Sequence, residues 1–296
     1  MKVENIQKLW DLLWQEYRHR VIYASIYEEM ITAAGGRIAN DHIAFRSLRM
    51  NVETAEGIVN LGIEYLESFV NFLGYEVAGE YNFPETHLYA RHYRHPQQEE
   101  FNLPKLFISE LIVDDLLEST QKLIYETVSA VKPKLYFEPT TVENILLDGL
   151  RFFNRPWQAP KRCIVEEVNR VTQYGAWVLL HGFAVNHFTG YVNIQNTPQF
   201  PDIETTVVGL ANLGVPMKAD IEGNINCGLR QTATQAVTEL VTVIDEKSGE
   251  EVQITWTYAY YEIAQRYMIE MDGKKELFDG FLGNNAQHLF EMTRVK

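Results

Sequence analysis

Apolar side chains in the first 35 residues recur at helical spacing. Leu9 and Leu13 illustrate the four-residue interval, and Gly35-Gly36 ends the pattern. Because side chains three or four positions apart lie on the same side of a helix, we expect helices over residues 4–35.

The period changes to two between Asp41 and Leu48, which is typical of a strand. Successive side chains of a strand point to opposite faces. One face of the expected strand therefore carries Ile43 and Phe45. The other face carries three residues of different character: His42, Ala44 and Arg46.

The rest of the chain alternates between the two periods. Helical spacing marks residues 53–73 and 202–213, and residues 111–175 are mostly helical. Short strand-like segments occupy residues 75–81, 87–93, 105–111, 176–195, 216–222, 227–233, 238–245 and 252–262. Residues 246–251 predict a hairpin turn, and residues 278–293 predict a closing loop and helix.

The order of these elements repeats once along the chain. Each half begins with a strand that carries a histidine, His42 in the first half and His187 in the second. A helix ending in Leu-Gly follows, and the last strand of each half carries a glutamate, Glu110 or Glu262. The repeat predicts two β-α-β-β-β units that join into one curved, barrel-like mixed sheet of the α+β class.

We expect these units to form a single catalytic domain over residues 1–296. Its predicted parts are a helical N-terminus, a first β-rich unit, a helical insertion, and a second β-rich unit with a C-terminal helix. Their boundaries are 1–40, 41–111, 112–175 and 176–296.

Composition and charge narrow the class of protein. Hydrophobic residues make up 46% of the chain, enough to bury a sizeable core. The net charge of −14 argues against nucleic-acid binding, which needs a basic face.

Neither a signal peptide nor a membrane-spanning run is apparent, so we expect a cytoplasmic protein without membrane contacts. Cys163 and Cys227 lack metal-ligand spacing and are expected as free, buried thiols.

Most of the eight histidines have ordinary interpretations. Six of them are explained by the segments in which they lie. His19 is in a charged helix, and His92 and His95 are in an arginine-rich loop. His288 is in a late helix, and His87 and His181 are in strand-like segments. His42 and His187 differ, because each lies in an apolar strand at a matching place in the repeat. A single inward-facing histidine is usually structural, but two at related positions indicate a joint role.

With Glu262, these two histidines could form the facial triad of a non-haem Fe(II) oxygenase, which leaves positions open for substrate and O₂. Imidazole and carboxylate also suit manganese or zinc, so ligand type alone does not identify the metal. The alternative for Glu262 is an exposed ion pair with Arg266 on one helix face. Glu110 is the rival carboxylate, because it is the expected counterpart of Glu262 in the first half.

Short motifs in a fixed order carry a resemblance to a known family, and they cover most of the chain from about residue 40. The main ones are Asp41–Arg46, Tyr174–Trp177, Val185–Thr189, Gln231–Thr234, Tyr260–Arg266, Phe278–Phe281 and Leu289–Glu291. With these motifs the chain resembles the iron-dependent 2-oxoadipate dioxygenase/decarboxylases, distant relatives of the vicinal oxygen chelate superfamily. The better-known members are longer, which leaves the substrate's side-chain length open.

The resemblance implies that His42, His187 and Glu262 bind Fe(II), and that Arg46 binds a substrate carboxylate. It implies a 2-oxo dicarboxylic acid and O₂ as the small-molecule partners. The implied reaction converts 2-oxoadipate to 2-hydroxyglutarate and CO₂. The alternation of a strand places Arg46 on the same face as His42, and a guanidinium can grip a carboxylate with two hydrogen bonds.

The roles of two further polar residues are open, and the triad is compatible with two other functions. Gln231 and Thr232 are candidate polar groups of the pocket, or else serve only the sheet. Four aromatic residues are expected in the core: Tyr260, Tyr261, Phe188 and Trp177. The same triad could serve a zinc- or manganese-dependent lyase or isomerase, or persist in a non-catalytic small-molecule-binding protein. The oligomeric state is not predicted.

Overall fold

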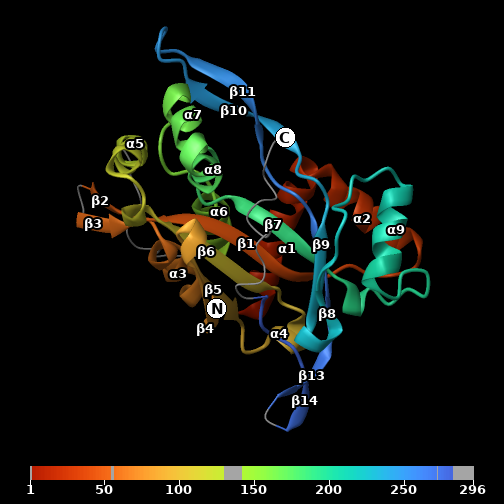
Figure 1. Cartoon of the computed structure of the whole chain (residues 1–296). Coiled ribbons are helices and arrows are strands. Elements are labelled where there is room, and N and C mark those ends of the chain that lie inside the picture. The colour runs from red at the N-terminus through yellow and green to blue at the C-terminus, as the bar shows by residue number, and fades with distance from the viewer. Residues whose placement is uncertain (1, 55–56, 130–141, 272, 283–296) are drawn as a thin grey trace.

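An eight-stranded mixed sheet curves through the centre of the molecule in this computed structural model, which describes residues 2–54, 57–129, 142–271 and 273–282 (Figure 1). Its strands lie in the order β4-β5-β6-β1-β7-β12-β9-β8. The first four are β4 Glu76–Phe83, β5 Leu88–Arg94, β6 Lys105–Ile112 and β1 Asn40–Arg49. The second four are β7 Val185–Tyr191, β12 Glu262–Arg266, β9 Leu229–Ala233 and β8 Glu222–Asn224.

The two halves of this sheet have the same topology. In each half the first strand pairs in parallel with the last, β1 with β6 and β7 with β12, and the remaining pairs are antiparallel. One helix follows the first strand of each half, α3 Ile63–Phe72 or α9 Ile203–Asn212. An antiparallel pairing of β1 with β7 joins the halves. The predicted repeat and the α+β class with a curved sheet are therefore confirmed.

The N-terminal helices cover one face of the central strands. They are α1 Val3–Arg20 and α2 Ile22–Ala33. Trp14 and Tyr17 of α1 pack on the ring of Phe188, with centroid distances of 5.2 and 5.0 Å. Because Phe188 turns toward α1, its neighbour His187 turns toward the opposite face of β7. The apolar core thus lies between the helices and the sheet and leaves the other face of the strands for the candidate site.

Helices also fill the connection between β6 and β7. They are α5 Glu118–Val128, α6 Val142–Phe152, α7 Arg162–Val171 and α8 Gln173–His181. The prediction of a strand from residue 176 is wrong, because α8 continues to His181. All of its residues from Tyr174 to His181 are buried, so no polar stripe reveals the helical period in the sequence. The hydroxyl of Thr172 begins α8 by accepting a hydrogen bond from Gly175 N.

Two other predicted elements differ from the structure. Residues 53–73 contain a hairpin before α3, formed by β2 Asn51–Thr54 and β3 Gly57–Asn60. Residues 252–262 divide into β11 Glu251–Thr257, which pairs with β10 Thr238–Ile244 in a separate two-stranded sheet, and β12 in the central sheet. An alternating pattern shows that a segment is extended but not which strand it pairs with.

Smaller differences occur near the chain's last strands. Residues 216–222 contribute a single bridge at Met217 and lead into the short β8. A hairpin of β13 Met268–Met271 and β14 Lys274–Leu277 was not predicted. The expected C-terminal helix lies outside the described residues beyond residue 282.

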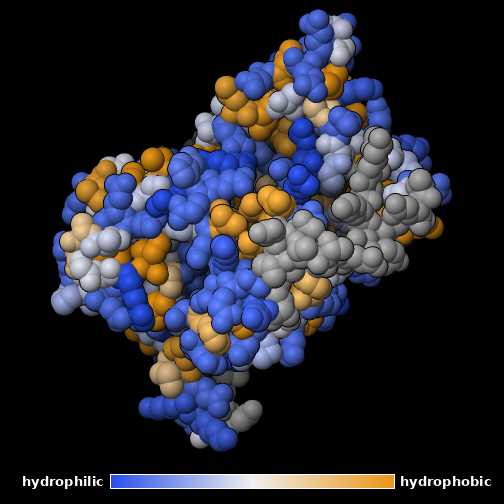
Figure 2. Space-filling view, turned by 180° about the vertical axis from the view of Figure 1, so that it is seen from behind, coloured by the Kyte–Doolittle hydropathy of each residue, from blue (hydrophilic) through white to orange (hydrophobic). Residues whose placement is uncertain are grey.

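One face of the molecule is mostly hydrophilic, with separate hydrophobic patches (Figure 2), and both cysteines lie near the surface. In the part of the chain that is described, no helix combines the length and apolar character that crossing a membrane requires. Both cysteines are free as expected, but their predicted burial is wrong. Cys163 is exposed on α7, and Cys227 is partly exposed in a turn.

Gly182 determines how the chain turns from α8 into β7. Its φ of +64° is unfavourable for other residues, and a Cβ atom there would lie 2.3 Å from Arg155 Cα. We expect Gly182→Ala to lower the free energy of unfolding by roughly 3 kcal/mol or more, measured by urea denaturation. Gly214→Ala is the control, since its φ of +81° is similar but no atom lies within 4 Å of the added Cβ. It should cost about 1 kcal/mol. Equal losses would contradict the importance of the close approach to Arg155.

Candidate metal centre

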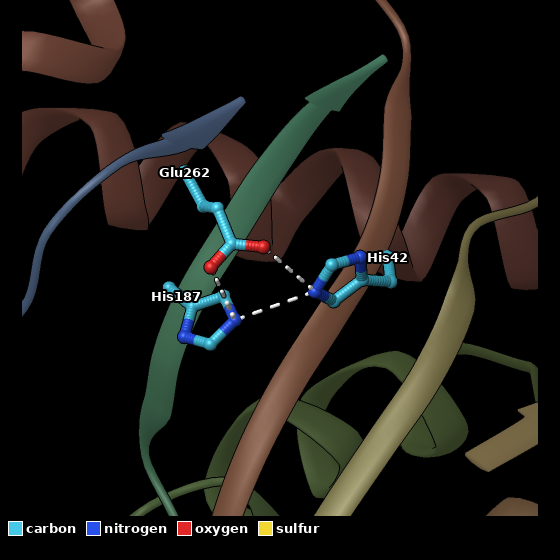
Figure 3. A group of neighbouring side chains, drawn as sticks. All are labelled: His42, His187 and Glu262. Atoms are coloured by element: carbon cyan, nitrogen blue, oxygen red, sulfur yellow. Dashed lines mark hydrogen bonds and ion pairs between the residues drawn. The ribbon is translucent and has the colours of Figure 1, made fainter. Parts of the chain in front are cut away.

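Three neighbouring strands bring the predicted ligands together. His42 lies on β1, His187 on β7, and Glu262 is the first residue of β12. The register places Thr189 of β7 opposite His42 on one side and opposite Glu262 on the other. Since His187 and Thr189 are two positions apart, their side chains share a face. All three ligands therefore point toward one place on the sheet (Figure 3).

Both distances from His42 fit one shared cation, and the third distance in the triad is longer. His42 Nε2 lies 3.4 Å from His187 Nε2 and 3.4 Å from Glu262 Oε1, and His187 Nε2 lies 3.9 Å from Glu262 Oε2. Two donors that are each about 2.1 Å from a common ion lie about 3.0–3.4 Å apart at octahedral to tetrahedral angles. His42 is 2% exposed and Glu262 is fully buried. The donor set thus matches a small divalent transition-metal ion in a dry site.

The residue before each histidine orients its ring. His42 Nδ1 lies 2.9 Å from Asp41 Oδ2, and His187 Nδ1 lies 3.1 Å from Asn186 Oδ1. A carboxylate or amide oxygen can only accept, so each Nδ1 carries the proton and donates it. The lone pair of each Nε2 then faces the site, which is the tautomer that a metal ligand needs. The repeated Asx-His pair was the signal in the sequence for these orienting residues.

A buried ion pair fixes the orienting carboxylate. Arg266 binds Asp41 with two hydrogen bonds, Nε to Oδ1 at 2.6 Å and Nη2 to Oδ2 at 2.8 Å. Burial alone would raise the pKa of Asp41, but Arg266 and Lys105 outweigh it and hold that pKa well below its usual value. Asp41 is therefore ionised. The alternative of a helical Glu262–Arg266 pair does not occur, because both residues lie on a strand.

Burial keeps the two histidines neutral and favours the protonated form of Glu262. It lowers the pKa of His42, and it lowers the pKa of His187 well below the ordinary value, so both imidazoles are neutral. Burial, followed by the charge of Glu222, raises the pKa of Glu262 to about 8. Glu262 Oε2 lacks a hydrogen-bond partner within the described chain. A buried carboxylate without compensation is costly, and a divalent ion at the triad would provide the missing charge.

Thr189 is a site residue that sequence reasoning missed. Its hydroxyl lies 3.0 Å from His42 Nε2 and 3.4 Å from Glu262 Oε1, and its side chain is fully buried. Its position two residues after His187 was the available signal. The hydroxyl contacts both side chains, and its one proton can be donated to only one of them at a time.

Arg46 reaches the same cavity as an unpaired cation. It lies four residues after His42 on β1, and it is 2% exposed. Its Nη1 and Nη2 have no hydrogen-bond partner among the residues that the structure describes. The guanidinium carbon lies 4.9 Å from the ring centre of Tyr174 and 5.1 Å from that of Trp177, both on α8. Burial lowers the pKa of Arg46. A desolvated guanidinium with two free donors is a site for an anion.

These groups line a small cavity of about 20 Å³. Its walls are His42, Ala44, Phe45, Arg46, Phe107, Ser109, Asn186, His187, Gln231, Glu262 and Phe281. Gln231 is thus beside the triad. Thr232, the next residue on the strand, is not among the residues that line the cavity. Its hydroxyl donates to Asp220 O at 2.9 Å. The other aromatic residues expected in the core are buried: Tyr260, Tyr261, Phe188 and Trp177.

The expected equivalence of Glu110 and Glu262 is wrong. Glu262 pairs with Thr189, two positions after His187, whereas the residue that pairs with Ala44, two positions after His42, is Phe107. Glu110 lies three residues further along β6. It accepts hydrogen bonds from Arg49 and from the backbone N–H of Ile63 at the start of α3. Both glutamates lie on the last strand of their half, but they pair with different positions of the first strand.

Known proteins share this fold over nearly the whole chain. A protein assigned to the glyoxalase superfamily from Ralstonia eutropha JMP134 has a TM-score of 0.78 at 23% identity, covering 95% of this chain and 86% of that one. Hydroxyglutarate synthase from Oryza sativa, solved in complex with 2-oxoadipate, has a TM-score of 0.77 at 22% identity, covering 97% and 91%. These likenesses show that the chain has the fold of these proteins over nearly its whole length.

Sequence comparisons identify the family. The chloroplastic 2-oxoadipate dioxygenase/decarboxylase of Arabidopsis thaliana is 27% identical over 91% of this chain and 72% of its own length. The corresponding protein of Oryza sativa subsp. japonica is 25% identical over 91% and 73%. The family model for 2-oxoadipate dioxygenase/decarboxylase matches residues 1–294. The chain therefore belongs to the 2-oxoadipate dioxygenase/decarboxylase family.

Proposed function

We propose that this enzyme is a non-haem Fe(II)-dependent oxygenase that converts 2-oxoadipate and O₂ to 2-hydroxyglutarate and CO₂. One observation carries the proposal: the neutral His42–His187 pair and Glu262 share a buried cavity with the unpaired guanidinium of Arg46. A metal and a carboxylate anion would compensate these two unmatched groups. The names of the Arabidopsis and Oryza relatives support the choice of substrate.

His42, His187 and Glu262 would hold the iron through two nitrogens and one oxygen. When bound, Fe(II) supplies the electrons and the coordination positions that allow dioxygen and a 2-oxo acid to react. Asp41 and Asn186 keep both imidazoles in the metal-binding tautomer. The three ligands come from rigid paired strands, so the chain itself orients the centre before substrate arrives.

Arg46 would bind the carboxylate of the substrate that is distant from the 2-oxo group. The rings of Tyr174 and Trp177 hold its guanidinium carbon at about 5 Å, which restricts the side chain before binding. Two parallel hydrogen bonds to one carboxylate would then fix both the distance and the direction of the substrate chain. Gln231 offers an amide in the same cavity for a further substrate oxygen.

The direct test uses protein purified without oxygen. We expect about one iron per chain by metal analysis, uptake of O₂ with 2-oxoadipate, and release of CO₂ in equal amount. Product without O₂ uptake would favour the zinc- or manganese-dependent lyase or isomerase. Binding of 2-oxoadipate without any product would favour a non-catalytic binding protein.

The raised pKa of Glu262 predicts that metal affinity depends on pH. Below about pH 8 the metal-free protein holds a proton on Glu262, and binding must release it. We expect the affinity for Co²⁺ to fall about ten-fold per pH unit as the pH decreases below 8, measured by competition with a chelator. Both histidines are already neutral near pH 7, so they add no further protons there.

Two matched variants check this assignment. Glu262→Gln should lower the affinity and remove the pH dependence, while Glu110→Gln should change neither, because Glu110 is bound to Arg49 and to the start of α3. Loss of metal in Glu110→Gln with retention in Glu262→Gln would transfer the ligand role to Glu110.

Replacing Arg46 should weaken substrate binding but spare the metal. Removing charged hydrogen bonds costs about 1.5–3 kcal/mol, so we expect Arg46→Leu to raise the KM for 2-oxoadipate by about 10- to 100-fold. The KM for 2-oxohexanoate, which lacks the second carboxylate, should change much less. Arg49→Leu on the same strand is the control, because Arg49 pairs with Glu110 instead of lining the cavity. An unchanged KM in Arg46→Leu would exclude the proposed contact.

A further inference from the structure

Residues Phe278–Phe281, called the strap below, follow β14 and bring one aromatic ring into the metal cavity. The Phe281 ring is 8% exposed and meets the His42 ring edge to face, with 4.7 Å between centroids. It also packs on Phe107 at 4.9 Å. Of the described residues that line the cavity, Phe281 alone lies outside the eight-stranded sheet. The others belong to β1, β6, β7, β9 and β12.

The closed cavity is too small for the substrate. Its volume of about 20 Å³ is little more than the roughly 10–15 Å³ that one water molecule needs. A 2-oxo dicarboxylic acid is several times larger than a water molecule, so one wall must move when it binds. Paired strands resist such movement because every backbone hydrogen bond to their neighbours would be strained. The strap is the wall that can move at the lowest cost.

Polar contacts hold the strap in place. Arg266 Nη1 donates to Phe278 O at 3.0 Å and to Gly280 O at 2.7 Å. Asp279 pairs with Lys105 at 2.7 Å and with Arg94 at 3.3 Å, and its side chain is 34% exposed. Water can replace the contacts of the partly exposed Asp279 when the segment moves, whereas the hydrogen bonds to the buried Arg266 and the packing of the Phe281 ring must be broken.

Space for the movement exists beside the strap. Leu277 and Asp279 line an open cleft of about 530 Å³, together with Arg94 and Lys105. The strap therefore contributes to the walls of two spaces, the nearly filled metal cavity and this larger cleft. It can withdraw Phe281 from the first by moving into the second.

From these contacts we infer that Phe281 is the movable wall and the specificity-determining residue of the substrate cavity. Its ring leaves the closed position as the 2-oxo acid enters and then bounds the space for the aliphatic chain of the substrate. The apolar side chains beside it, Ala44 and Phe107, suit methylene groups rather than charges. The substrate class and the need for a wall to move rest on the proposed function, whereas the choice of Phe281 as that wall rests on its place outside the sheet and between the two spaces.

The test compares the wild type with Phe281→Leu, Phe281→Ala and the control Phe278→Ala, whose ring is on the strap but not in the cavity lining. Two readouts are measured on each. The first is the ratio of kcat/KM for 2-oxopimelate, one methylene longer, to that for 2-oxoadipate. The second is the rate at which dipicolinate removes Co²⁺ from the protein, which needs neither substrate nor turnover. Thermal melting establishes that each variant is folded.

We expect Phe281→Ala to raise the kcat/KM ratio about ten-fold or more, because one methylene in an apolar pocket is worth about that factor. Phe281→Leu should lie between Phe281→Ala and the wild type, and both should lose Co²⁺ faster. Phe278→Ala should match the wild type. If Phe281→Ala does not fold, the Phe281→Leu comparison decides.

Wild-type values of both readouts in folded Phe281 variants would overturn the inference. If the wild type turns over no 2-oxo acid, the proposed function fails separately. Faster loss of Co²⁺ in the Phe281 variants alone would then still support the movable wall, and unchanged loss would overturn it.

Discussion

The antiparallel pairing of β1 with β7 is the constraint on which the site depends. It joins the two halves of the sheet and places Thr189 opposite His42 and His187 opposite Ala44. A shift of one residue would turn one histidine into the apolar core under α1, since side chains alternate between the faces. The packing of Phe188 on Trp14 and Tyr17 opposes such a shift. The hydrophobic face of β7 therefore fixes the geometry of its polar face.

Charged side chains are buried on both sides of the metal centre, but among the described residues only those behind it compensate each other. Asp41 and Arg266 compensate each other behind the metal centre, so they add rigidity without attracting a ligand. Arg46 and Glu262 lie inside the cavity without a partner for Nη1, Nη2 or Oε2 in the described part of the chain. A divalent cation and a doubly charged diacid would balance both groups together, and either one alone would leave an excess charge in a dry site. Metal and substrate binding should therefore support each other.

Much of this arrangement could be predicted from the sequence. Period-two alternation located β1 and its polar face, and the repeat located His42 and His187 together with the topology of both halves. Contacts between distant segments could not be predicted. The Asp41–Arg266 pair spans 225 positions, α8 is apolar on every side, and the strap has no periodicity. The wrong equivalence of Glu110 and Glu262 arose because chain order does not reveal register.

That corrected register explains why the candidate centre offers three protein ligands rather than four among the residues that the structure describes. The two halves share one topology, yet where the second half places Glu262 the first places Phe107. A carboxylate at residue 107 would point at the same ion and could complete four protein ligands, as in closed structural sites. An aromatic ring cannot coordinate in that way, so coordination positions stay open on this side. The first half instead contributes Arg46, which suits the distal carboxylate of a diacid, and Ala44 and Phe107, which suit its chain. In the proposed function, one half would thus supply most of the metal site, and the half of matching topology would supply most of the substrate site.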